Sequence, residues 1–297
     1  MNNKGSDEEM NASLKLSDAK SKAKETKPIV RRFARFGYMT IGIVYGMIGV
    51  LAALAAFGPG GEMTGTSGVL QSIAKMPLGE FALWVIGIGL FGYIIWNFIK
   101  VFKDPDNVGT DTKGIIIRTG YFIRGVIYAN LAFVAIKLAS HTGNAGGGNA
   151  EKTISAKLME QPFGVWLVGL VGFIIIGYGA YELYNGIKEK FMAEFKTSEM
   201  NDMERNVARI AGKMGLISRG IVLSMMGFFF IRSAITNNPD ESKGLGGALT
   251  ELAGQPFGKL LLAIVAIGVI LYGVYQIILG RYQHMNFGTE KSTLKKH

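Results

Sequence analysis

The residues Gln161-Pro162-Phe163-Gly164 introduce a long apolar run that ends in Tyr178-Gly179-Ala180-Tyr181-Glu182. The same pattern returns twice, as Gln255-Pro256-Phe257-Gly258 with Tyr272 and Tyr275-Gln276, and more loosely as Met76-Pro77-Leu78-Gly79 with Tyr93 and Trp96-Asn97. In each copy a tyrosine lies sixteen residues after the proline, an aromatic residue lies three further on, and a polar residue comes next. We therefore predict that three copies of one membrane hairpin build the chain.

The apolar residues are gathered into six runs, each long enough to cross a bilayer as a helix. They lie near residues 33–57, 78–102, 115–139, 163–187, 211–235 and 257–281. A span takes roughly 20 residues at about 1.5 Å per residue. The 297-residue chain is 49% hydrophobic and only 18% charged, below the ~25% charged residues of soluble domains. The runs are too long for strands and do not alternate, so the sequence predicts an all-α membrane protein with six transmembrane helices.

Lysine and arginine are distributed unequally between the segments that connect these runs. If the N-terminus is inside, the inner segments carry 23 basic residues and the outer segments carry 4, which are Lys75, Lys152, Lys157 and Lys243. The positive-inside rule therefore predicts that both termini lie in the cytoplasm. The same distribution explains the net charge of +10, and we expect no nucleic-acid partner.

The composition divides the chain into two tails and three membrane repeats. Residues 1–30 are polar and mixed in charge, which is typical of a disordered cytoplasmic tail. They lack an early apolar region, so we expect no cleavable signal peptide. The membrane repeats should then cover residues 31–110, 111–200 and 201–285, with a second cytoplasmic tail at 286–297.

The connections between the spans differ on the two sides of the membrane. Each outer connection leads through a mildly amphipathic stretch into Pro77, Pro162 or Pro256, which suits a short interfacial helix, a sharp turn and then the second span. The inner connection at 188–210 is longer than its counterpart in the first half of the chain. We predict an amphipathic helix there, on the cytoplasmic face.

The first helix of each hairpin carries a shared glycine pattern. A basic residue lies two positions before a glycine in Arg35-Phe36-Gly37, Arg118-Thr119-Gly120 and Lys213-Met214-Gly215, and a second glycine follows five residues later. Such glycines let a neighbouring backbone approach closely. Repeats that share one orientation have their symmetry axis along the membrane normal. If three of them close around that axis, a rotation of about 120° superposes one repeat on the next. The sequence leaves open whether the first or the second helices line that axis.

Together these features resemble a bacterial membrane family catalogued as a domain of unknown function, family 1206. Its pattern is three tandem two-helix repeats with an Arg-Gly step in the first helix of a repeat, represented here by Arg124-Gly125 and Arg219-Gly220. The first repeat departs from it with Ile41-Gly42. The resemblance covers about residues 31–285, and it implies a six-helix inner-membrane protein with no known activity.

Five polar residues are expected within the spans at similar depth, and they are the candidate site: Arg124, Arg219, Glu182, Asn97 and Gln276. Arg124 lies six residues beyond the interfacial Arg118, so roughly 9 Å deeper. Arg219 is placed alike, and Glu182 lies six residues before Lys188 on a helix of opposite direction. A charged group in the membrane normally faces protein or water and finds a partner. We therefore predict that Glu182 pairs with Arg124 or Arg219.

Three interpretations of this cluster stay open. The arginines could reach the cytoplasm while Glu182 pairs with one of them for structure. They could instead form an electropositive pocket for an anionic lipid headgroup, an anionic solute or a membrane partner. They could also line the path of a channel or transporter. We expect no enzyme, because no nucleophile–base pair or paired carboxylate lies at this depth.

The residue inventory also excludes several chemistries. The chain has no cysteine and three histidines without metal-ligand spacing, so we expect neither a metal nor a cofactor. The expected partners are membrane lipids, including anionic lipids. The oligomeric state is left open.

Overall fold

The computed structural model describes residues 4–58, 63–141 and 150–285, which form helices joined by short connections. The α-helices are α1 (Lys4–Phe57), α2 (Thr66–Ala74), α3 (Gly79–Lys103), α4 (Thr112–Ala139), α5 (Ala150–Met159), α6 (Gly164–Ile187), α7 (Asp202–Thr236), α8 (Leu245–Ala253) and α9 (Gly258–Tyr282). The short 3-10 helices are η1 (Lys190–Glu194), η2 (Thr197–Glu199) and η3 (Pro239–Glu241). Six helices in this part of the chain, α1, α3, α4, α6, α7 and α9, are long and apolar enough to cross a membrane. The six predicted spans are thereby confirmed.

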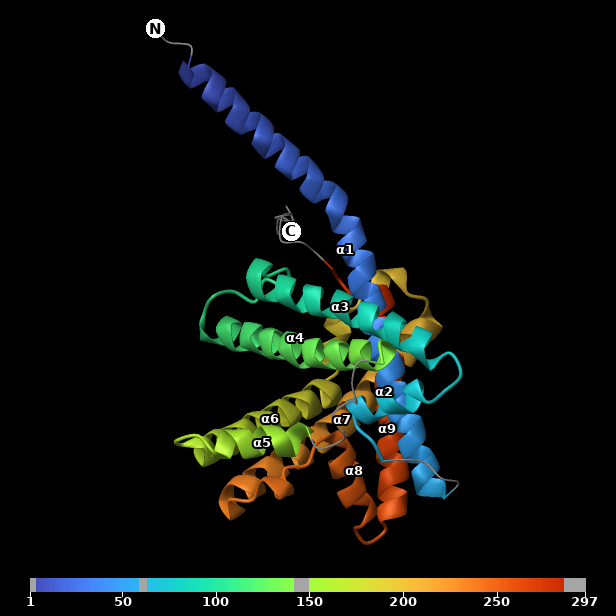
Figure 1. The fold of residues 1–297 in the computed structure, drawn as a ribbon. Helices are drawn as coiled ribbons and strands as arrows, with labels where there is room; N and C mark the ends of the chain where they lie inside the picture. The colour runs from blue at the N-terminus through green and yellow to red at the C-terminus, as the bar shows by residue number, and fades with distance from the viewer. Residues whose placement is uncertain (1–3, 59–62, 142–149, 286–297) are drawn as a thin grey trace.

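The six long helices form three antiparallel pairs, α1 with α9, α3 with α4, and α6 with α7 (Figure 1). Each pair joins the second helix of one hairpin to the first helix of another, and the α9–α1 pair connects the third hairpin back to the first. Further contacts join α1 to α3 and α7 to α9. First and second helices therefore alternate around the bundle, so neither set alone lines its centre.

The bundle has a basic end and a proline end. At the basic end α4 and α7 begin and α3, α6 and α9 finish, and basic residues such as Arg118, Lys188 and Lys213 lie there. At the proline end the short helices α2, α5 and α8 precede the three prolines and the start of each second span. The predicted short helix and sharp turn are confirmed in all three hairpins.

The turn after each proline explains the repeated Pro-x-Gly sequence. The middle residue adopts the left-handed conformation, with φ of 63° at Leu78 and 61° at both Phe163 and Phe257. The glycine that follows lies against the end of the short helix, so a Cβ atom on Gly164 would lie 1.7 Å from the carbonyl oxygen of Leu158. A larger residue at this position would therefore displace the short helix from the span.

The inner segment at 188–210 differs from the predicted amphipathic helix. Its start forms η1 and η2, and the side chains of Phe191 and Phe195 are buried with their ring centroids 5.5 and 5.8 Å from that of Tyr275 on α9. The rest of the segment belongs to α7, which begins at Asp202 behind a capping box formed by Asn201 and Glu204. The prediction was wrong because these apolar residues pack into the bundle instead of lying along a membrane surface.

The N-terminal tail continues the first long helix. Residues 4–30 extend α1 away from the bundle (Figure 1). The stretch from Ser6 to Lys27 contains neither glycine nor proline and is rich in strong helix formers. The predicted tail at 286–297 lies outside the described residues.

The second hairpin departs from the other two in its packing. In the first and third hairpins the two helices touch, with a Cβ on Gly37 placed 2.4 Å from the backbone nitrogen of Tyr93 and one on Gly215 placed 2.6 Å from the Cα of Tyr272. Among the described residues α4 and α6 barely contact each other, and a Cβ on the corresponding Gly120 would meet nothing within 4 Å. The threefold arrangement therefore has one open side, between α4 and α6.

Candidate functional site

An ion pair between Arg219 and Glu182 forms the centre of the candidate site. It joins α7 to α6, whose backbones approach closely because a glycine lies on each side: a Cβ on Gly220 would lie 2.8 Å from the carbonyl oxygen of Gly179. The Glu182 side chain is only 4% exposed. The prediction that Glu182 pairs with one of the two arginines is confirmed, and the partner is Arg219.

Three tyrosine rings surround the Arg219 guanidinium. Its central carbon lies 4.8 Å from the ring centroid of Tyr272, 5.5 Å from that of Tyr45 and 5.7 Å from that of Tyr178. The electron-rich face of an aromatic ring attracts a cation, and the attraction grows when water is excluded. Arg219 is therefore neutralised by Glu182 and further stabilised by rings from α1, α6 and α9.

Arg124 lies in a different environment. Its guanidinium lies 5.2 Å from the ring centroid of Tyr178 and 5.7 Å from that of Tyr121. Within the described residues it makes no ion pair. Its Nε, like that of Arg219, is buried without a hydrogen-bond partner. Two guanidinium groups thus share the neighbourhood of one carboxylate, which leaves an excess of one positive charge.

The remaining predicted site residues lie at the edge of this cluster. The Nδ2 of Asn97 donates a hydrogen bond to the Tyr93 carbonyl oxygen at 2.9 Å, so Asn97 is satisfied by its own helix. Gln276 donates to the hydroxyl of Tyr272, while its Oε1 is buried without a partner. The structure thus connects Gln276 to Arg219 through Tyr272, whereas no direct contact joins Asn97 to either arginine among the described interactions.

Tyr45 and Tyr128 also belong to the cluster and were not predicted from the sequence. The hydroxyl of Tyr128 donates to that of Tyr45 at 3.5 Å, and the Tyr128 ring packs edge-on against Tyr93 with centroids 4.9 Å apart. Both residues are buried. Each lies three residues after the second glycine of its repeat, Gly42 or Gly125, and this equivalence was the available signal. They fill the centre of the bundle beside the arginines.

Tyr121 links the cluster to the basic end. Its hydroxyl donates to Asp106 at 2.9 Å, and Asp106 forms an ion pair with the buried Lys100 at 3.0 Å. Nearby, Asp104 accepts hydrogen bonds from two backbone N–H groups and pairs with Arg118 at 2.8 Å. Burial alone would raise the pKa of Asp104, but the bonds from Gly109, Val108 and Arg118 outweigh it and lower that pKa below its usual range.

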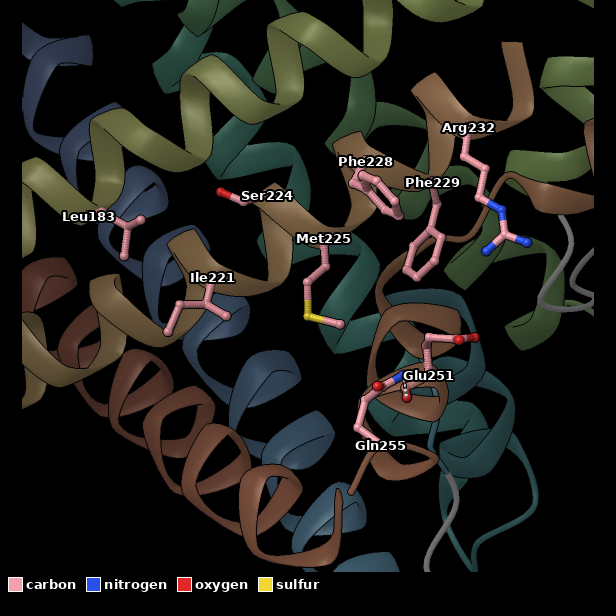
Figure 2. A pocket seen from close by; sticks show the side chains of 9 residues that line it. All are labelled: Leu183, Ile221, Ser224, Met225, Phe228, Phe229, Arg232, Glu251 and Gln255. Carbon is pink, nitrogen blue, oxygen red and sulfur yellow. Dashed lines mark hydrogen bonds between the residues drawn. The ribbon is translucent and has the colours of Figure 1, made fainter. Parts of the chain in front are cut away.

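A separate hollow of about 600 Å³ lies along α7 toward the proline end (Figure 2). Its walls are largely apolar, including Ile221, Met225 and Phe228, and its polar rim contains Arg232 and Glu251. Both rim charges already have partners, because Arg232 pairs with Glu241 and Glu251 pairs with Lys243. The charged side chains that line this hollow are therefore both paired, so they offer no free charge to select a ligand.

The central cluster is cationic and aromatic. Its cationic groups suit a phosphate or carboxylate, because guanidinium groups donate charge-assisted hydrogen bonds to such anions. No group of three or more metal-ligating side chains occurs among the residues that the structure describes.

Six apolar helices arranged as three tandem hairpins around a tyrosine–arginine cluster define a multi-pass helical membrane protein. The chain belongs to the family described as Domain of Unknown Function (DUF1206), whose model matches residues 36–104, 119–189 and 214–283. The three matches agree with the three repeats. The chain is also 42% identical over 263 residues to the Uncharacterized protein YxxB of Bacillus subtilis (strain 168), covering 89% of this chain and 94% of that relative. No solved structure matches it.

Proposed function

We propose that this protein is a non-enzymatic component of the bacterial inner membrane that binds the headgroup of an anionic lipid at Arg124. The observation that carries the proposal is the contrast between the two arginines. Arg219 forms an ion pair with Glu182, whereas Arg124 lies over the rings of Tyr121 and Tyr178 and forms no ion pair among the described residues. The phosphate of a lipid would supply the missing anion.

A charged side chain within a membrane is costly unless it finds a partner. Insertion scales assign roughly 2.5–3.5 kcal/mol to an arginine at the centre of a span, and less near the interface. The rings of Tyr121 and Tyr178 offset part of this cost, since a desolvated cation–π contact contributes about 2 kcal/mol. A bound phosphate would offset the rest through charge-assisted hydrogen bonds.

The charge distribution supports the side of the membrane on which this binding would occur. The 23 basic residues of the inner segments, against 4 in the outer ones, favour an orientation with the basic end and both termini in the cytoplasm. The cytoplasmic leaflet carries the negative surface potential that attracts basic segments. Arg124 would then face the leaflet that supplies anionic headgroups.

The alternative of a channel or transporter has weaker support. A conduit needs a polar path across the membrane or broken helices. Here buried tyrosines, including Tyr45, Tyr93 and Tyr128, pack against one another beside the arginines in the centre of the bundle. Flux of ions or small solutes through proteoliposomes would favour the alternative over lipid binding.

The test is the lipid retained by the purified protein. Wild type and the Arg124→Ala variant would be extracted from membranes in mild detergent, and bound phospholipid would be measured by native mass spectrometry. Arg232→Ala is the matched control, since Arg232 lies on α7 at the proline end and pairs with Glu241. We expect Arg124→Ala to lose anionic lipid and Arg232→Ala to retain it.

Two further results would decide against the proposal. Equal retention of anionic lipid by wild type and a folded Arg124→Ala protein would remove Arg124 from the site. Displacement of the lipid by millimolar inorganic phosphate, without any preference among headgroups, would indicate a site for a soluble anion instead.

A further inference from the structure

Two bulky residues keep α4 and α6 of the second hairpin from packing against each other. In the first hairpin Thr40 lies against Gly89, and a Cβ on that glycine would lie 2.0 Å from the threonine Oγ1. In the third hairpin Ser218 lies against Gly268, and a Cβ on that glycine would lie 1.7 Å from the serine Oγ. The equivalent positions of the second hairpin are Ile123 and Ile174. A pair of isoleucines cannot fit into the space that a hydroxyl and a glycine share.

Both isoleucines are exposed, Ile123 by 43% and Ile174 by 51%. Gly120 and Gly177 flank them, and a Cβ on either glycine would have no neighbour within 4 Å. In the first hairpin the position equivalent to Gly177 is Gly92, which packs directly on the backbone of Phe33. The space between α4 and α6 is therefore apolar and lacks the helix–helix contact found at the same place in the other two hairpins.

This opening leads to the charged cluster. Arg124 lies on α4 one turn beyond Gly120, and Tyr178 on α6 is next to Gly177. The Arg124 guanidinium lies over the Tyr178 ring. A ligand that enters sideways from the membrane between α4 and α6 would therefore contact apolar side chains first and then the guanidinium of Arg124.

The charges at this depth favour a lipid over a second copy of the chain. A helix from another copy would have to bring an anion to Arg124, and the carboxylate it carries at that depth is Glu182. That side chain is buried and already paired with Arg219. An anionic phospholipid brings both parts that the opening lacks, an apolar chain and a phosphate.

We propose that the opening between α4 and α6 receives an acyl chain of the anionic lipid whose headgroup Arg124 binds. This inference rests on the proposed function and adds the direction of entry and the location of the chain. Ile123 and Ile174 hold the hairpin open and contact the chain. The first and third hairpins, closed by Gly37 and Gly215, do not bind lipid in this way.

The test uses phosphatidylglycerol with a photoreactive group in its acyl chain, added to the full-length protein in detergent micelles. After irradiation, the labelled peptides would be identified by mass spectrometry. We expect labels on α4 and α6 near Ile123 and Ile174 and reduced labelling in Arg124→Ala. Labels spread evenly over the lipid-facing helices, or concentrated along the hollow beside Phe228, would overturn the inference.

A variant pair tests the role of the two isoleucines. The double variant Ile123→Ser/Ile174→Gly carries the residues found at the equivalent positions of the third hairpin, and it should close the opening. Labelling of α4 and α6 by the lipid should then fall to the level seen with a non-lipid probe. Ile88→Ser/Ile267→Gly makes the same chemical change at two exposed positions elsewhere and should leave labelling unchanged. Unchanged labelling of the first variant would overturn the inference. If that variant does not fold, the peptide map of the wild type still decides.

Two further outcomes separate the explanations. If lipid retention depends on Arg124 but the label lies away from α4 and α6, the proposed function stands and this inference fails. If Arg124→Ala leaves the retention of anionic lipid unchanged, the proposed function fails, and this inference fails with it. A disulfide-linked dimer of Ile174→Cys in native membranes would show that a second copy covers the opening, and it would overturn the inference.

Discussion

Arg124 lies 5.2 Å from the ring centroid of Tyr178, although the two residues belong to helices that barely touch. The contact therefore joins α4 to α6 at the level of the charged cluster. Tyr178 also faces Arg219 at 5.7 Å. One ring is thus shared by two guanidinium groups, and it connects the paired arginine to the unpaired one.

We expect Tyr178→Leu to weaken this connection. Loss of the two cation–π contacts should lower the free energy of unfolding by about 0.5–2 kcal/mol, since such contacts strengthen when water is excluded. The measurement is thermal unfolding in detergent, with Tyr178→Phe as the control that keeps the ring. Equal loss of stability in both variants would show that the hydroxyl, not the ring, matters.

Glu182→Gln should be more damaging, because it leaves Arg219 buried without a carboxylate. Breaking one partner of a buried ion pair costs about 3–5 kcal/mol, and a second change, Arg219→Gln, should recover part of it. Glu251→Gln provides the comparison: its pair with Lys243 is more exposed and should contribute about 1 kcal/mol or less. A double-mutant cycle with no coupling between residues 182 and 219 would contradict this.

Equivalent glycines should respond differently to alanine. In Gly37→Ala the new Cβ would lie 2.4 Å from the Tyr93 backbone nitrogen, so we expect a loss of about 1–3 kcal/mol from overpacking. Gly120→Ala places its Cβ in open space, and the change should stay within about 0.5 kcal/mol. Comparison of the two unfolding temperatures checks this prediction. It fails if Gly120→Ala is the more harmful change.

The stability contributed by Asp104 should depend on pH. Because the pKa of Asp104 is lowered in the folded protein, its contribution is fully present above the unfolded pKa, about 4, and is lost as pH falls through the folded value. Asp104→Asn should therefore lower the unfolding temperature at pH 7 and differ less from wild type in acid. Asp202→Asn is the control, because that side chain is 97% exposed. A difference independent of pH would contradict the argument.

Cysteine labelling can check the proposed orientation, since the native chain contains no cysteine. A membrane-impermeant maleimide should label Lys243→Cys on intact cells and Lys196→Cys only after the membrane is broken. The reverse result would place the basic end outside and would remove the cytoplasmic leaflet as the source of the lipid.

The sequence was sufficient for the hairpins and for placing Arg219 level with Glu182 along the bundle, because both depend on the repeat period and the helix rise. It could not decide which arginine pairs with Glu182. The choice depends on α6 packing against α7 while α4 barely contacts α6. This arrangement is decided by how well the side chains of neighbouring helices pack together. The signal for the fit was nevertheless present in Ile123 and Ile174, which replace small residues of the other repeats. The packing of Phe191 and Phe195 into the bundle depends on contacts with Tyr275 of α9, which no local pattern reveals.

The pairing of helices across repeats has a consequence for how the chain assembles as it is synthesised. The second helix of each hairpin finds its largest contact with the first helix of a different hairpin, and α4 and α6 find almost none with each other. The middle hairpin therefore cannot act as an independent folding unit on leaving the ribosome. After insertion α4 can dock on α3 at once, whereas α6 must wait for α7. The last helix, α9, then docks on α1, so the first helix to be made completes its packing only when the last has been inserted.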